Sequence, residues 1–199
     1  MNCESGMDNI NLNLGYELIN LKKLNEEWEN LDRRSITVIE SICNTFPQFI
    51  ETKSFNLFDS IHSNLQKIHN IFAQMKKIVE CLKKMRENLE TTFSDNQQID
   101  LNESLKLCLS RGKYNCQVSQ SDRIDFISSF YEMYSSDLEY KQALMDNFDL
   151  EKHFNVKRKK IEYNLILFKW KTKLFVKEDI IFEIFKKIET SKQIDELIN

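Results

Sequence analysis

The sequence contains very few of the residues that turn a chain. Three of its 199 residues are Gly and one is Pro, well below the average usage of about 7% and about 5%. A β-rich fold needs turn residues roughly every 8–12 positions, so this scarcity argues against such a fold and predicts long helices. The longest apolar run, 165–168, is far shorter than the roughly 20 residues of a membrane span, so no membrane partner is expected.

Signatures of secretion, catalysis and metal binding are also missing. The five Cys contain no C-x-x-C pair, and residues 1–20 lack the regions of a signal peptide, which favours a reducing compartment. No Gly-rich phosphate loop, H-E-x-x-H or G-x-S-x-G occurs. His62 and His69 lie about 10 Å apart on a helix, too far to bind one metal ion alone, and Cys108 and Cys116 lack further zinc ligands. We therefore expect no enzyme activity, no metal and no cofactor.

Apolar residues at helical spacing are what the sequence does contain. A first helix is predicted over about 12–46, and Pro47 predicts a break or kink after Phe46. The apolar stripe of this helix recurs at intervals of three and four, at Leu14, Leu18, Leu21, Leu24, Trp28, Leu31, Val38 and Ile42.

The second predicted helix has the strongest pattern. Asn56 is expected to cap it, and ten of eleven seam positions over five heptads are apolar. Ile71, Ile78 and Met85 widen the seam, which favours a bundle of three or more helices over a two-stranded coiled coil. Because the seam is long, we expect it to exceed what this chain can cover alone. The seam positions are Phe58, Ile61, Leu65, Ile68, Phe72, Met75, Val79, Leu82, Arg86, Leu89 and Phe93.

The rest of the chain predicts a linker and further helices. Residues 94–121 are interpreted as a linker, with a short helix ended by Gly112 as a further expectation. A third helix is expected to start at a capping Asp122, a further helix to run over about 151–173 with Leu165 and Phe168 among its apolar positions, and a last helix to start near Lys177. The predicted fold is all-α, an elongated helical bundle or coiled coil of about four to five helices, two of them long. Its organisation is a helical hairpin over 1–93, the linker over 94–121 and a C-terminal helical segment over 122–199.

Protein–protein contact is the function that this pattern favours. The expected partners are other helical proteins in a hetero-oligomer. The hypothesis assigns the contacts to the seam, the late aromatic stripe and the two Trp, a residue type enriched at binding hot spots. The candidate residues are Trp28, Phe72, Met75, Val79, Leu82, Tyr131, Tyr134 and Trp170.

A basic patch stands out in an otherwise acidic chain. It centres on Lys157, Arg158, Lys159 and Lys160, and the residues from Lys152 to Lys173 include eight Lys or Arg and one acid, a local charge of +7 in a chain of net charge −3. Such a patch serves as a nuclear-import signal, a nucleic-acid contact, a dock for an acidic partner or only the solvated face of a helix. The sequence leaves these readings open.

Several segments resemble one known family. Residues 24–31, which include Trp28, look like a Trp-acid-x-Leu segment, and residues 133–141 look like a Met-Tyr-x-x-acid-Leu-x-x-Lys run. Residues 65–78 are similar to a coiled-coil helix, and Trp170 with residues 175–178 resembles a closing segment. Together they resemble the cyclin-dependent kinase-interacting protein (CINP) family. Leu21 stands where family members carry a second Trp, so a sister helical family is the alternative.

The resemblance implies a nuclear adaptor without an active site, present also in the cytoplasm as a further expectation. It implies association with cell-cycle and replication kinases, with checkpoint signalling, or with an AAA+ ATPase complex used in ribosome maturation and DNA replication. The alternative is a structural coiled-coil subunit of a kinetochore, cytoskeletal or vesicle-tethering complex. Nucleic-acid binding through the region from Lys157 to Lys173 is a third hypothesis.

Overall fold

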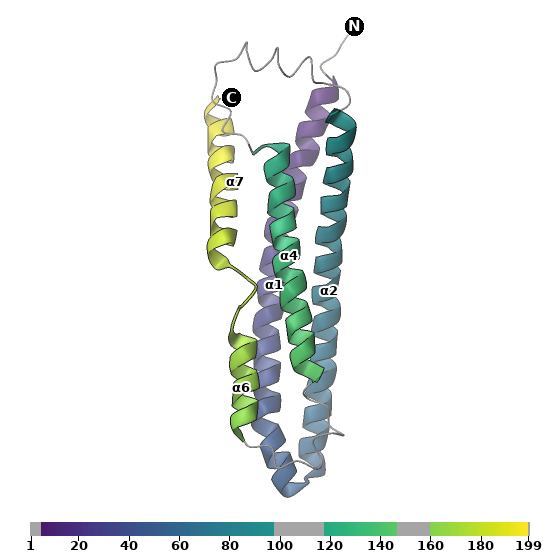
Figure 1. The fold of residues 1–199 in the computed structure, drawn as a ribbon, viewed down its shortest axis with the longest axis vertical. Coiled ribbons are helices and arrows are strands. Elements are labelled where there is room, and N and C mark those ends of the chain that lie inside the picture. The colour runs from purple at the N-terminus through teal and green to yellow at the C-terminus, as the bar shows by residue number, and fades with distance from the viewer. Residues whose placement is uncertain (1–4, 98–117, 147–159, 199) are drawn as a thin grey trace. The chain divides into compact units, whose positions relative to one another are not determined.

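The computed structural model shows an all-α protein. It describes residues 5–97, 118–146 and 160–198, and side chains from Glu17 onward in the first of these ranges. The described residues form five helices: α1 (Ser5–Thr52), α2 (Phe55–Gln97), α4 (Gln120–Met145), α6 (Lys160–Lys171) and α7 (Glu178–Ile198) (Figure 1). No strand occurs in these ranges. The prediction of an all-α fold with long helices is confirmed.

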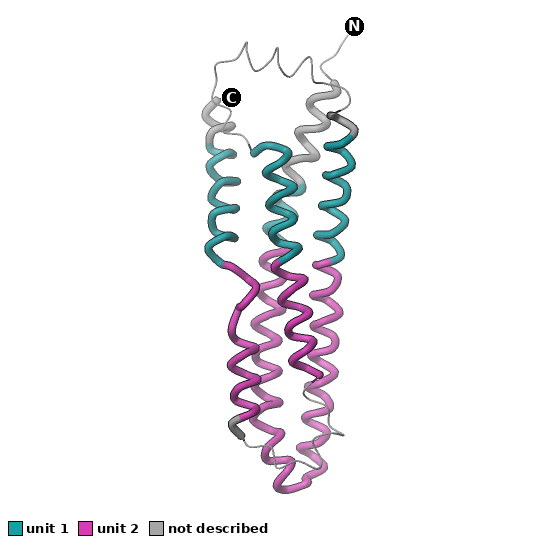
Figure 2. The backbone as a smooth tube through the Cα atoms, in the orientation of Figure 1, with its two compact units in different colours: residues 1–23, 80–132, 178–199 teal, residues 24–79, 133–177 magenta. Residues whose placement is uncertain are grey.

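The chain forms two compact units, each built from separated stretches of sequence (Figure 2). Unit 1 comprises Met1–Lys23, Glu80–Glu132 and Glu178–Asn199, and unit 2 comprises Leu24–Val79 and Met133–Lys177. Helices α1, α2 and α4 each contribute one portion to each unit, while α7 belongs to unit 1 and α6 to unit 2. The units therefore do not coincide with the sequential segments 1–93, 94–121 and 122–199.

Helix α1 continues through Pro47, so a break after Phe46 is wrong, and the kink predicted as its alternative stays a prediction. A helix-interior Pro costs about 3 kcal/mol because it removes one backbone donor. Phe46 and Phe49 are both buried, and each contributes roughly 1.5–3 kcal/mol of apolar burial that offsets this cost. The helix ends at Thr52, and Lys53 then takes a positive φ of 51° while its amide donates to the Phe49 carbonyl at 2.8 Å. A left-handed residue is a common way to end a helix.

Helix α2 starts one residue before the expected cap. The amide of Phe58 donates to the carbonyl of Ser54 at 3.1 Å, which makes Ser54 the capping position and Asn56 a residue of the first turn. The prediction of a cap at Asn56 is therefore wrong by two residues. Only Lys53 and Ser54 join α1 to α2, so the two helices form a tight hairpin (Figure 1).

Helix α4 starts at Gln120, and Asp122 is not its cap. The hydroxyl of Ser119 accepts a hydrogen bond from the Asp122 amide at 3.0 Å, and Oδ2 of Asp122 accepts one from the Ser119 amide at 3.0 Å. This reciprocal pair is a capping box, with Ser119 as the cap and Asp122 three residues later. The predicted cap at Asp122 is therefore wrong by three residues, because Ser119 is the cap.

The chain itself buries six of the eleven seam positions of α2 and leaves the other five half-buried. Ile61, Ile68, Met75 and Leu82 are all fully buried, and the widening residue Ile78 is 3% exposed. The expectation that this chain could not cover the seam is therefore wrong. The physical reason is that α2 has several neighbours: unit 2 contains portions of α1 and α4 together with α6, and unit 1 contains portions of α1 and α4 together with α7.

Helix α6 turns a different face inward from the one that its sequence pattern suggests. Leu165 and Phe168, expected among its apolar positions, are 49% and 68% exposed. Tyr163 and Trp170, on another side of the helix, are 2% and 1% exposed. Both sides of this helix are apolar, and the larger aromatic surfaces of Tyr163 and Trp170 are the ones buried, which contributes more free energy per residue. Residues 151–159 of the predicted helix lie outside the described residues.

Candidate partner-binding site

An aromatic stack joins α1 to α4 in the core of unit 2. The rings of Trp28 and Tyr134 lie parallel, with centroids 4.1 Å apart and an interplanar angle of 1°. The Tyr134 hydroxyl donates to Oδ1 of Asn25 at 2.6 Å, and Asn25 itself is buried. Burial raises the pKa of the Tyr134 phenol, and the nearby carboxylates of Glu29, Asp137 and Asp32 raise it further. The phenol is therefore a permanent hydrogen-bond donor that fixes the register of the two helices.

A buried charge cluster lies in the same unit. Nζ of Lys141 is 2.5 Å from Oδ1 of Asp32 and 2.6 Å from Oδ2 of Asp137, and all three residues are at most 5% exposed. Oδ1 of Asp137 is buried and has no hydrogen-bond partner. Burial raises the pKa of the Asp137 carboxyl, although the Lys141 ammonium opposes this shift. Both acids accept a hydrogen bond from the same ammonium, so its removal deprives two buried carboxylates of that donor.

Trp170 anchors α6 to this core. Its indole Nε1 donates to the buried Ser35 hydroxyl at 2.9 Å, and that hydroxyl donates to the Asp32 carbonyl at 2.7 Å. The ring of Phe72 on α2 stacks against Trp170 with centroids 5.8 Å apart. The residues that carry the family resemblance in α1, α4 and α6 therefore meet in one core, where they hold helices together.

The candidate partner-binding residues are mostly core residues. Trp28, Phe72, Met75 and Tyr134 are buried in unit 2, as is Trp170, and Leu82 is buried in unit 1. Val79 and Tyr131 are partly exposed. Partner contact through the buried side chains stays a prediction that would require a unit to open.

Tyr131 has a local role in unit 1. The guanidinium of Arg86, the one polar residue of the predicted seam, lies 4.7 Å from the centre of the Tyr131 ring, and its Nε is 3.6 Å from Oε1 of Glu90. A cation over an aromatic face is attracted by the ring quadrupole. This pairing accounts for an Arg at a position where the pattern would place an apolar residue.

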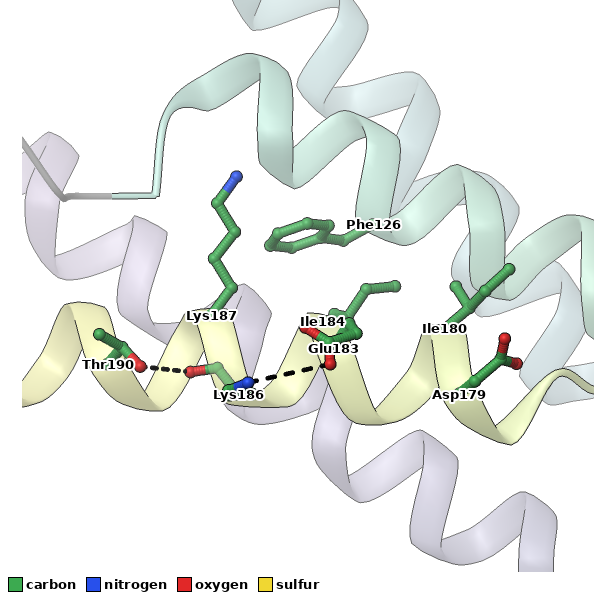
Figure 3. Close-up of a pocket in the computed structure, with 8 residues that line it drawn as sticks. All are labelled: Phe126, Asp179, Ile180, Glu183, Ile184, Lys186, Lys187 and Thr190. Carbon is green, nitrogen blue, oxygen red and sulfur yellow. Dashed lines mark hydrogen bonds and ion pairs between the residues drawn. The ribbon is translucent and has the colours of Figure 1, made fainter.

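Unit 1 also contains a hollow of about 640 Å³ between α4 and α7 (Figure 3). Its apolar part is formed by Phe126, Ile180 and Ile184, while Nζ of Lys187 lies 5.6 Å from the Phe126 ring and 2.7 Å from Oδ1 of Asp122. Its rim carries both acids and lysines, so its charge selects no ligand class. The charged rim residues are Asp179, Glu183, Lys186 and Lys187.

The described side chains hold no metal-binding cluster. No three His, Cys, Asp or Glu residues among them lie close enough together to bind a metal ion. His62 bonds Gln66, and Nδ1 of His69 lies 2.7 Å from the Leu65 carbonyl. Burial raises the pKa of the Cys43 thiol to about 12, and a thiol with so high a pKa is a poor nucleophile. Cys108 and Cys116 lie outside the described residues.

Exposed apolar side chains are the feature of unit 2 that sequence reasoning missed. Seven large ones are exposed in the described chain, and four of them fall within eleven residues: Leu165, Phe168, Leu174 and Phe175. The pattern placed the first two on an apolar stripe but could not tell which stripe of α6 faces the core. Lysines follow closely in this stretch, at positions 169, 171, 173 and 177.

The basic patch is described only at its end. Lys160 is the first residue of α6, while Lys157, Arg158 and Lys159 lie outside the described residues.

No described helix is long and apolar enough to cross a bilayer. Comparison with protein-family models, with curated proteins and with solved structures finds no match to this chain.

Proposed function

We propose that this chain is a non-enzymatic helical adaptor subunit that works inside a nuclear multi-protein assembly. One observation carries the proposal: Leu165, Phe168 and Leu174 in unit 2 are between 49% and 68% exposed within a stretch of ten residues. Large apolar side chains exposed close together mark interaction sites, because their contact with water is unfavourable until a partner covers them.

The core geometry supports an adaptor over a catalyst. The buried polar groups of unit 2 bond one another, as Lys141 bonds Asp32 and Asp137, and as Trp170 bonds Ser35. Catalytic groups must instead reach a substrate. The charged cluster therefore serves helix packing, and the function of the chain rests on its surface.

The choice of assembly rests on the resemblance and on the basic run. Similarity to the CINP family supports a cell-cycle kinase and checkpoint assembly or an AAA+ ATPase complex in ribosome maturation and replication. The run Lys157, Arg158, Lys159 and Lys160 supports nuclear import. The alternative, a structural coiled-coil subunit, needs a free seam for pairing, and the burial of Ile68, Met75 and Leu82 by the chain's own helices argues against it.

The test is isolation of the native assembly. The tagged full chain is expressed at its natural level in its source cells, and the complex is purified, sized by light scattering and identified by mass spectrometry. We expect a stoichiometric complex that contains an AAA+ ATPase or kinases. A monomer without stoichiometric partners would refute the adaptor proposal, and filament or tether subunits in the complex would favour the alternative.

A further inference from the structure

We infer that the exposed side of α6, formed by Leu165 and Phe168 and bordered by Lys169 and Lys171, binds an acidic amphipathic helix of a partner protein. This inference rests on the proposed adaptor function and names the surface and the chemistry of its partner. We call this surface the outer face of α6.

The outer face is held in place by the opposite side of the same helix. Tyr163 and Trp170 are buried, and the Trp170 indole donates to Ser35 on α1. The ring of Tyr163 also contacts Phe46 of α1, with centroids 5.2 Å apart. Because both ends of the inner side are anchored, the outer face belongs to a rigid helix. A surface that is already ordered loses little conformational entropy on binding.

The spacing of the apolar side chains suits a helix as the ligand. Leu165 and Phe168 are three residues apart, so they lie one above the other on the same side of α6. A helix of 12 residues is about 18 Å long, which matches roughly three turns of a second helix. An amphipathic helix presents apolar residues at intervals of three and four, and these can pack against such a pair.

The charges beside the outer face select an acidic ligand. Lys169 and Lys171 are exposed, and Lys173 and Lys177 follow in the next six residues. The only acid from residue 160 to residue 177 is Glu162. Lys171 lies 3.2 Å from Glu40, an ion pair in which both side chains are more than 40% exposed, so it contributes little to stability. Acidic residues on a partner helix would complement this border and speed association.

The charge of the whole chain favours a short acidic helix over an extended anionic surface. The basic stretch from Lys152 to Lys173 has a charge of +7, but the chain sums to −3, so the rest of the chain is strongly acidic. A bilayer or a nucleic acid presents negative charge over a large area and would also repel these acids. A helix of a few turns interacts with the local charge alone.

The experiment measures binding of a designed peptide to the purified full chain. The probe is a fluorescein-labelled helical peptide with Leu at i, i+4 and i+7 and Glu at the flanking positions, and its control replaces every Glu with Lys. Fluorescence anisotropy is expected to show saturable binding of the Glu peptide that weakens as salt is raised, and at least about tenfold weaker binding of the Lys peptide.

Variants assign the site. The double variant Leu165→Ser with Phe168→Ser is expected to weaken binding of the Glu peptide by at least about tenfold, and Lys169→Glu by several-fold. Phe182→Ser on α7 is the matched control, because Phe182 is 64% exposed and Phe168 is 68% exposed. It should leave binding unchanged. All these residues are exposed, so circular dichroism should show the same fold in every variant.

Three results of the peptide assay would overturn the inference. One is no saturable binding of the Glu peptide, another is equal binding of both peptides, and the third is an equal loss in the control and double variants. Phosphatidylcholine–phosphatidylserine vesicles are tested in parallel by co-sedimentation. A different outcome is that the wild type binds the vesicles but not the Glu peptide, and that the double variant loses vesicle binding. In that case the outer face is a membrane contact and the inference is wrong.

The native complex separates this inference from the adaptor proposal. The double variant is purified from source cells beside the wild type. Loss of one partner from the double variant, with the others retained, is the expected result. If the wild type retrieves stoichiometric partners and the double variant retrieves all of them equally, the adaptor proposal stands and the outer face is not a partner site. If the wild type retrieves none, the adaptor proposal itself fails, whatever the peptide assay shows.

Discussion

Replacement of Lys141 by Met is expected to be among the most destabilising single changes in unit 2. Met keeps most of the side-chain length and removes only the ammonium. Nζ of Lys141 is the hydrogen-bond donor to both Asp32 and Asp137, and Lys141 is 1% exposed. Without it, the two buried carboxylates on α1 and α4 lose the ammonium that donates to both of them. Removal of one partner from a buried ion pair costs about 3–5 kcal/mol, a large part of the roughly 5–15 kcal/mol that stabilises a typical domain.

The stability lost in the Lys141→Met variant should depend on pH, and the direction of that dependence follows from the pKa of Asp137. In the wild type, burial already raises the pKa of Asp137 in the folded state. The Lys141 ammonium opposes this shift, so its loss raises the folded-state pKa of Asp137 further above the unfolded value of about 3.9. Each pKa unit corresponds to about 1.4 kcal/mol. As pH falls, the folded state of the variant takes up protons before the unfolded state does, so its deficit shrinks.

The assay is urea unfolding followed by circular dichroism at pH values from neutral down to about 4. Lys169→Met is the control for removal of an exposed lysine. A triple variant that adds Asp32→Asn and Asp137→Asn to Lys141→Met should recover most of the lost stability, because it leaves no buried charge. A loss below about 1 kcal/mol at neutral pH, or one that is independent of pH, would refute the interpretation of the cluster as a buried, mutually dependent ion network.

Three further substitutions test other contacts by the same unfolding assay. Tyr134→Phe removes the hydroxyl that donates to Asn25 at 2.6 Å and should cost about 1–1.5 kcal/mol; no loss would mean that water satisfies Asn25. Ser119→Ala breaks the capping box and should cost about 1 kcal/mol near neutral pH. Hydrogen bonds from Lys187, the larger cause, and from Ser119 lower the pKa of Asp122 to about 2. Asp122 therefore contributes to the free energy of unfolding above about pH 4, and this contribution is lost as pH falls toward 2. The loss at low pH should be smaller in the Ser119→Ala variant. Pro47→Ala restores a helix-interior donor and should stabilise the protein by about 2 kcal/mol, whereas destabilisation would show that Pro47 makes a packing contact that Ala cannot replace.

The α2 seam shows how far periodicity leads. The apolar repeat at threes and fours predicted a long helix with one wide buried face, and Ile61, Ile68, Met75 and Leu82 are indeed buried. An apolar repeat predicts that one side of a helix is buried, but it does not identify the element that buries it. The pattern therefore favours long partner helices as the cover of the seam, whereas the chain's own helices cover it.

Errors at helix ends have a local physical cause. Asn56 and Asp122 are good capping residues by type, yet Ser54 and Ser119 occupy the caps. Several polar residues near each start could accept the first backbone donors, and the choice depends on where the helix is anchored by packing. Pro47 is a comparable case, since a strong local signal for a break is overridden by the burial of Phe46 and Phe49.

The spacing of apolar residues is enough to predict that this protein is helical and which side of α2 is buried, because helix formation and amphipathicity depend on neighbours three and four residues apart. The tertiary fold creates the polar core, since Lys141 donates to Asp32, which is 109 residues away in the sequence, a separation that no local pattern encodes. It also decided which side of α6 faces water. That helix is apolar on two sides, and the choice depends on the fit of Trp170 and Tyr163 against α1 and α2, so the exposed Leu165 and Phe168 could be recognised only once the inner side was occupied.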